Sequence, residues 1–354
     1  MNPMLNTWTW VIWLATTLVV IWSTRNPIYL CLILLTIIFV WLSAVKRVKN
    51  QYANSRSVIP FSPLRISFYI IFFSALFNGL ISRFGDTVLV YLPDWIPYLG
   101  GPVTLEALAF GAINGLVLSG ILIAFMTVNL SLPVRSLIRL IPRAFYPLAV
   151  VTSIAITFLP NTTRQVQQIR ESQAIRGHRV QGLKDWLPLI MPLLIGGLER
   201  AMGLAETMTA RGFAGDEGEH RAAHTRLGLV FGLFFLLAGW LFQLTAAFRV
   251  VGIIIAAFGI SLIFYALWSG GRRVQRSQYR REAFTYRDAL VITGCAFIVS
   301  IYLLPVPWGD KSSLAYNPYP ILTLPQFDFL IALASFVLVI PATWKTNADN
   351  ELFN

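Results

Sequence analysis

The sequence has few charged residues for its length. Only 12% of its 354 residues are Asp, Glu, Lys or Arg, against about 25% in an ordinary soluble domain, and 56% are hydrophobic. This composition excludes a typical soluble enzyme and predicts a protein with several membrane spans. A net charge of +12 could indicate nucleic-acid binding, but Lys and Arg of membrane proteins gather in cytoplasmic loops, so we expect no nucleic-acid partner.

The sequence also lacks the residue patterns of several chemical sites. Cys31 and Cys295 lie in apolar runs without the spacing of a disulfide framework or a zinc site. His220 and His224 stand four apart but have no third ligand nearby, so we expect no metal and no cofactor. The acidic residues are scattered except in residues 216–219, whereas a membrane transferase usually clusters carboxylates around magnesium. No Gly-Lys-Ser/Thr loop is present to cradle the phosphates of ATP.

Long apolar runs recur along the chain, and a helix needs about 20 such residues to cross a bilayer. They predict an all-α polytopic membrane protein with about eight transmembrane helices. The N-terminus lacks the basic residues of a cleavable signal, so we interpret the first run as a retained span. The expected spans lie in residues 8–24, 28–45, 66–82, 104–128, 227–268 (long enough for two, with a tight turn), 289–304 and 327–343.

Two further apolar runs, residues 144–160 and 186–198, are not expected to cross the membrane. Both have basic residues on either side, whereas a crossing has one basic side. Pro188 and Pro192 also disfavour a straight buried helix in the second run. We therefore expect both runs to form helices at the cytoplasmic interface. Eight spans then place both termini in the cytoplasm, with 24 of the 28 Lys and Arg residues on that side.

The predicted organisation has three parts: an N-terminal block of four spans in residues 1–129, a cytoplasmic segment in residues 130–225, and a C-terminal block of about four spans in residues 226–354. Small residues recur at every fourth position in both halves of the cytoplasmic segment. Such faces let two helix backbones approach closely. We therefore expect two long helices to cross there, through Ser153, Thr157, Gly197, Ala201 and Ala205.

The cytoplasmic segment contains one charged pattern twice. Residues 171–177 read ESQAIRG and residues 206–212 read ETMTARG, so each has a Glu, four residues and then Arg-Gly. Gly is preferred just past a helix C-terminus because it adopts positive φ without steric cost, and Arg in the last turn is favoured by the helix dipole. One copy is only a helix stop signal. Two copies predict two guanidinium groups at helix tips, suited to acidic pockets on a cytoplasmic partner.

On these motifs the chain resembles the transmembrane T component of energy-coupling factor transporters, a family that includes cobalt-transport T proteins. The resemblance covers roughly residues 8–245. Ala210-Arg211-Gly212 fits the family's Ala-Arg-Gly motif fully, and Arg176-Gly177 fits with Ile175 in place of the alanine. Residues 23–30, STRNPIYL, and residues 158–174, FLPNTTRQVQQIRESQA, also look like this family.

The resemblance implies a non-catalytic scaffold in the plasma membrane of a prokaryote. Its expected partners are the lipid bilayer, a dimer of cytoplasmic ABC ATPase subunits and a small membrane-embedded S component that binds the substrate, a vitamin or a metal ion. ATP hydrolysis by the dimer would move the coupling helices and reorient the S component. The implied ATPase-docking residues are Ala174, Arg176, Gly177, Ala210, Arg211 and Gly212.

The sequence departs from the family pattern in its length. Family members usually end one span after the second motif, whereas this chain continues for roughly a hundred residues, including a second basic loop at residues 270–281. A secondary transporter and an integral membrane transferase are the alternative functions. The first would show broken spans in repeated halves, and the second would show clustered carboxylates; neither pattern is clear here.

Overall fold

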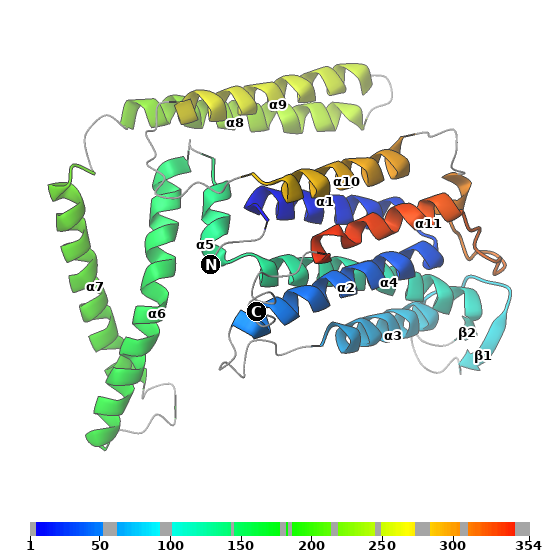
Figure 1. Cartoon of the computed structure of the whole chain (residues 1–354), viewed down its shortest axis with the longest axis horizontal. Helices are drawn as coiled ribbons and strands as arrows, with labels where there is room; N and C mark the ends of the chain where they lie inside the picture. The colour runs from blue at the N-terminus through cyan, green and yellow to red at the C-terminus, as the bar shows by residue number, and fades with distance from the viewer. Residues whose placement is uncertain are drawn as a thin grey trace, which may run out of the picture. The chain divides into compact units, whose positions relative to one another are not determined.

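A computed structural model describes residues 5–51, 62–92, 101–142, 145–177, 182, 186–213, 219–244, 249–272, 284–304 and 311–343. Helices dominate this described part of the chain (Figure 1). The elements up to residue 140 are α1 (Thr7–Ser23), α2 (Pro27–Gln51), α3 (Pro63–Ile81), β1 (Val88–Leu92), β2 (Gly101–Thr104), α4 (Leu105–Ser131), α5 (Val134–Leu137) and η1 (Ile138–Leu140). The later elements are α6 (Tyr146–Ile175), α7 (Leu187–Ala210), α8 (Glu219–Gln243), α9 (Arg249–Arg272), α10 (Tyr286–Leu303), η5 (Lys311–Leu314), α11 (Phe329–Ser335) and η6 (Phe336–Ala342).

Seven of the described helices are long and apolar enough to cross a membrane. Six of these seven, together with the shorter apolar helices Thr7–Ser23 and Phe329–Ala342, coincide with the eight expected spans. The expectation of an all-α polytopic membrane protein is therefore confirmed. The seventh is α7, whose length and composition would also allow it to cross the membrane. We still expect it at the cytoplasmic interface, because basic residues flank it on both sides and because it contains prolines.

The chain divides into two compact units, and the division differs from the three expected parts. Residues 1–134 and 281–354 form the first unit, and residues 135–280 form the second. The expected C-terminal block, residues 226–354, is therefore split: α8 and α9 belong to the second unit, whereas α10, η5, α11 and η6 belong to the first.

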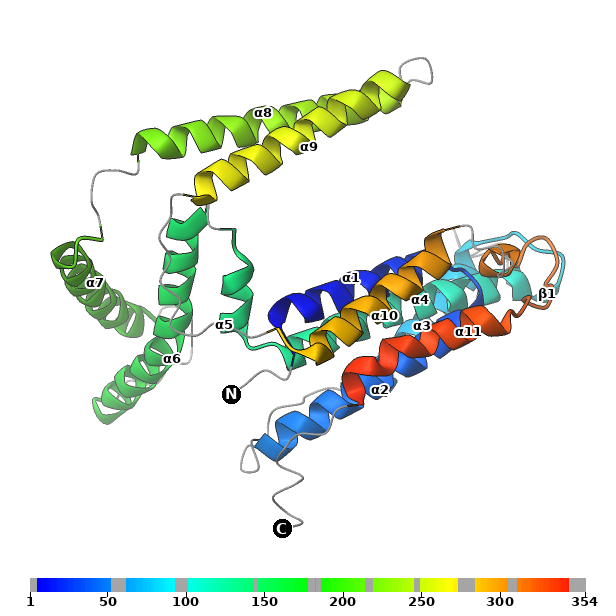
Figure 2. The same cartoon turned by 45° about the horizontal axis from the view of Figure 1, so that its top comes forward.

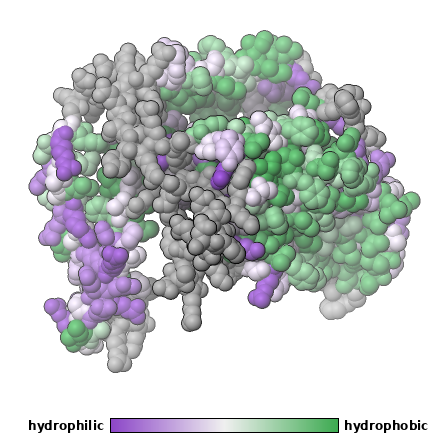
Figure 3. All heavy atoms as spheres, in the orientation of Figure 1, coloured by the Kyte–Doolittle hydropathy of each residue, from purple (hydrophilic) through white to green (hydrophobic). Residues whose placement is uncertain are grey.

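The first unit is a helical bundle in which helices from the N-terminal and C-terminal parts of the chain pack together (Figure 2). Helix α1 packs against α10 and α4, α2 packs against α4, α11 and η6, and α3 packs against α4. The side chains of Trp13, Tyr29, Ile37, Ile123 and Ile298 are fully buried in its core. The bundle surface is mostly hydrophobic, as expected for helices that face lipid (Figure 3).

Hydrogen bonds also join the C-terminal segment of this unit to its N-terminal helices. The buried Asp288 carboxylate accepts from the Thr9 hydroxyl at 2.7 Å, and the Trp13 indole donates to the Leu338 carbonyl at 3.1 Å. The fully buried Asn26 amide donates to the Ser313 and Gln326 carbonyls at 2.8 and 2.7 Å. Polar groups inside a membrane bundle need such partners, which explains why the C-terminal helices belong to this unit.

A short hairpin of β1 and β2 precedes α4 and lies between the expected spans 66–82 and 104–128. The two strands are antiparallel, and Leu92 pairs with Gly101. The hairpin leads directly into α4, whose N-cap Thr104 accepts from the Ala107 amide at 3.4 Å.

In the second unit, α8 and α9 form an antiparallel pair, as expected for two spans in residues 227–268. Glycines let the two backbones touch. A Cβ atom at Gly259 would stand 2.7 Å from the Leu236 nitrogen and 2.8 Å from the Gly232 carbonyl oxygen, closer than real Cβ contacts allow. This contact is the close van der Waals packing that small residues permit between membrane helices.

We therefore expect Gly259→Leu to separate α8 from α9. Overpacking typically costs about 1–3 kcal/mol, and the upper end applies because the neighbours are backbone atoms that cannot rotate away. The measurement is the melting temperature of the purified protein in detergent. Gly203→Leu is the matched control, because no neighbouring atom lies within 4 Å of the Cβ position at Gly203 on α7. Equal melting temperatures for the two variants would contradict the prediction.

Candidate docking site at two helix ends

Helix α6 has an apolar first half and a polar second half. Residues 146–159 are mostly apolar, whereas residues 161–175 read NTTRQVQQIRESQAI. Pro160 stands at the change of composition and has no N–H for the helix ladder. The polar half ends at the first Arg-Gly motif.

Helix α7 ends in a complete Schellman motif built by the second Arg-Gly pair. Arg211 is the C-cap, and Gly212 has a φ of 73°. The Gly212 amide donates to the Thr209 carbonyl at 2.9 Å, and the Phe213 amide donates to the Met208 carbonyl at 3.0 Å. Positive φ is cheap only for glycine, so the Arg-Gly order stops the helix directly after the arginine.

Helix α6 ends in the same way. Arg176 is its C-cap, Gly177 has a φ of 81°, and the Gly177 amide donates to the Ala174 carbonyl at 3.0 Å. The residue that would complete the motif, His178, lies outside the described residues. Both Arg-Gly motifs are therefore helix stops, as the sequence predicts.

Both arginines are exposed at these ends, and so are Ala174, Ala210 and the two glycines. Within the described part of the chain, neither guanidinium has a hydrogen-bonding or ion-pair partner. Ile175, which replaces the family's alanine, is 88% exposed. Its larger side chain therefore widens the first tip. The two tips can therefore each offer a planar group of N–H donors to a carboxylate on another protein.

The two tips lie at opposite ends of the α6–α7 pair, because the helices run antiparallel (Figures 1 and 2). The Tyr146 and Phe213 rings, 6.4 Å apart, join the start of α6 to the end of α7. The polar half of α6 meets the middle of α7, where the Arg200 guanidinium donates to the Gln165 side-chain oxygen.

The crossing expected through the small residues stays a prediction, and the contacts that the structure gives between α6 and α7 lie at other residues. Ser153, Thr157, Ala201 and Ala205 are exposed, and no neighbouring atom lies within 4 Å of the Cβ position at Gly197. Small residues permit close approach but supply only van der Waals attraction, so they do not select one meeting point. A charged hydrogen-bond donor and its acceptor do select one. The sequence analysis missed this contact, whose residues are Gln165, Gly196 and Arg200.

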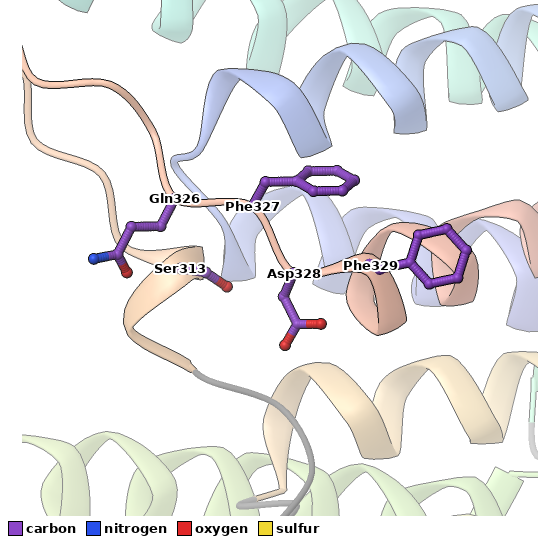
Figure 4. Close-up of a pocket in the computed structure, with 5 residues that line it drawn as sticks. All are labelled: Ser313, Gln326, Phe327, Asp328 and Phe329. Atoms are coloured by element: carbon purple, nitrogen blue, oxygen red, sulfur yellow. The ribbon is translucent and has the colours of Figure 1, made fainter.

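Outside these helix ends, the first unit has a shallow hollow of about 490 Å³. It is lined by Ser313, Gln326, Phe327, Asp328 and Phe329 (Figure 4). The Asp328 carboxylate accepts from the Leu330 amide at 2.9 Å and so caps α11. The Ser313 and Gln326 carbonyls accept from Asn26. These polar groups hold the fold together, which makes the hollow a poor substrate site. No group of three or more metal-ligating side chains occurs among the described residues.

Known proteins similar to this chain are transporter components. The family described as cobalt transport protein (CbiQ) matches residues 4–223. The energy-coupling factor transporter transmembrane protein EcfT of Macrococcus caseolyticus is 26% identical over 186 residues, which are 47% of this chain and 66% of the relative. EcfT of Listeria innocua is 28% identical over 194 residues, 48% of this chain and 69% of the relative. EcfT of Lacticaseibacillus paracasei is 28% identical over 249 residues, 64% of this chain and 85% of the relative.

These matches agree with the resemblance carried by the two Arg-Gly motifs, which both lie inside the matched region. The region ends close to the start of α8, so α9 and the C-terminal helices lie beyond it. The matched residues make up more than half of the chain, and the chain is therefore a multi-pass membrane protein that belongs to the cobalt transport protein (CbiQ) family.

Proposed function

We propose that this chain is the transmembrane scaffold, or T component, of an energy-coupling factor importer. It binds a dimer of cytoplasmic ABC ATPase subunits through its two Arg-Gly helix ends and transmits their ATP-driven motion to a membrane-embedded S component. The cargo, a vitamin or a metal ion, is bound by the S component, and this chain performs no chemistry. The observation that carries the proposal is the pair of exposed arginines, Arg176 and Arg211, at opposite ends of one helix pair.

The geometry supports a twin partner. A dimer of identical or similar ATPases offers two equivalent acidic grooves, and two separate, similarly capped tips match two grooves better than one. Simultaneous engagement of both tips also raises the affinity above that of either tip alone. The first half of each helix carries exposed apolar side chains, such as Leu159 on α6 and Leu194 on α7, which suit contact with lipid or with a membrane-embedded partner.

Affinity purification from native membranes in a mild detergent tests this proposal. We expect nucleotide-binding subunits to co-purify with the wild-type chain at two copies per chain, together with a small hydrophobic membrane protein. Recovery of the chain without any nucleotide-binding subunit would reject the T-component function.

The proposal also requires both tips, and both chain termini, to lie in the cytoplasm. Ser172 and Thr209 are exposed near the two tips. Cysteines placed there should react with a membrane-impermeant maleimide only after the cells are opened. Labelling of either cysteine in intact cells would place that tip outside the cell and exclude ATPase docking.

A further inference from the structure

Besides the ring contact of Tyr146 with Phe213, helices α6 and α7 are joined by a three-residue clasp formed by Gln165, Gly196 and Arg200. On α7, the Arg200 Nε donates to the Gly196 carbonyl at 2.9 Å, one turn earlier in the same helix. The second arm of the same guanidinium donates to the Gln165 side-chain oxygen on α6. Arg200 is thus fixed to its own helix by one nitrogen and to the neighbouring helix by another.

At Gly196 the end of the Gln165 side chain lies close against α7. A Cβ atom at this position would stand 2.7 Å from the Gln165 side-chain nitrogen, so the amide lies directly on the α7 backbone. Gln165 and Arg200 are both partly buried, in contrast to the exposed Ser153, Thr157, Ala201 and Ala205 on the same two helices. The polar clasp is therefore a partly buried point at which the two helices meet.

The clasp lies between the helix stems and the docking tips. It follows Pro160 on α6 and Pro192 on α7, and the Arg-Gly motif of each helix lies beyond it. At 1.5 Å per residue, the α6 tip is about 16 Å from Gln165 and the α7 tip is about 22 Å from Gly196. The clasp lies part-way along both helices, and the ring contact between Tyr146 and Phe213 lies at the start of α6 and the end of α7.

We propose that Gln165, Gly196 and Arg200 are positioning residues that hold the two Arg-Gly tips at the spacing of the ATPase grooves and make the two arms move together. This inference rests on the proposed function for its biological role, but the clasp itself can be tested without any partner. If the clasp holds the tips, breaking it should broaden the distribution of distances between them. It should also lower the affinity for the ATPase dimer, because the two tips no longer bind both grooves at once.

Distances between spin labels test the clasp directly. Labels are attached to cysteines at Ser172 and Thr209, near the two tips, in a chain whose native Cys31 and Cys295 are replaced by alanine, reconstituted in nanodiscs. We expect a narrow distance distribution, which Arg200→Ala broadens at least twofold. The exchanged pair Gln165→Arg with Arg200→Gln presents the same two groups from opposite helices and should restore the narrow distribution. The matched control, Arg164→Ala, removes an exposed arginine beside Gln165 and should change nothing.

A second measurement uses the ATPase subunits that co-purify with the wild-type chain. Arg200→Ala should weaken their binding about tenfold, since the tips no longer fit both grooves together, and the exchanged pair should recover most of this loss. An unchanged distance distribution in Arg200→Ala, or equal broadening in Arg164→Ala, would overturn the clasp. A distribution that broadens as expected, in a chain that binds no ATPase, would instead reject the T-component function.

Discussion

Replacing both Arg176 and Arg211 by glutamate should leave the protein folded in the membrane but remove its ATPase subunits. Both side chains are exposed and make no hydrogen bond or ion pair among the described residues, so the fold loses only the small helix-dipole contribution of about 0.3–1 kcal/mol at each helix end. A hydrogen bond to a charged group contributes about 1.5–3 kcal/mol, so two lost pairs, with repulsion added, should weaken binding on the order of 100-fold or more. The measurement is the affinity of the ATPase subunits for the chain in nanodiscs.

The two single variants separate the contributions of the two tips. Each should retain weak binding through the remaining tip, because one groove is still engaged. The matched control is Arg164→Glu with Arg170→Glu, which makes the same change in net charge at two exposed positions on the polar half of α6. If the control pair weakens binding as strongly as the tip pair, general electrostatic attraction replaces specific docking. If the tip pair retains full binding, the docking proposal fails.

Removing residues 281–354 should prevent the first unit from assembling. The deletion leaves buried donors such as Asn26 and Trp13 without their acceptors, and it exposes the faces of α1 and α2 that pack against α10 and α11. Each unsatisfied buried group costs about 1–3 kcal/mol, and a domain is stable by only about 5–15 kcal/mol in total. We expect the truncated chain to be degraded or to aggregate, measured as loss of the monodisperse peak in size-exclusion chromatography.

Co-expression of residues 281–354 as a separate chain should rescue part of the truncated protein, because the lost contacts are non-covalent. A milder version of the test is Asn26→Ala, which removes two donated hydrogen bonds and the cap that the Asn26 oxygen gives to the Ile28 amide at 3.0 Å. Its control is Asn161→Ala, at an exposed position of α6. A truncated chain with the wild-type melting temperature would show that the C-terminal helices are dispensable.

The sequence predicts the helices well because hydropathy and length are local properties. The run at residues 8–24 corresponds to Thr7–Ser23, and residues 66–82 correspond to Pro63–Ile81. The two helix stops are equally local, since Arg-Gly with positive φ needs no distant partner. These signals were sufficient to indicate both the architecture and the family to which the chain belongs.

The pairing of the helices could not be predicted in the same way. Asn26 and Asp288 look like ordinary polar residues in the sequence, and only the fold brings them to acceptors and donors that are hundreds of residues away. The clasp shows the same limit, because one arginine and one glutamine 35 residues apart give no periodic signal. Small residues at every fourth position do give such a signal, but it indicates where helices can meet and not where they do.

The clasp divides α6 and α7 unequally, and this gives the two tips different leverage. For a pivot of 10° about the contact, the end of α6 would travel about 3 Å and the end of α7 about 4 Å, at 1.5 Å of rise per residue. An ATPase dimer that moves both tips by the same distance would therefore rotate α6 through a larger angle than α7, because the arm that ends at Arg176 is the shorter one. Such an imbalance would tilt the stems as well as spread them.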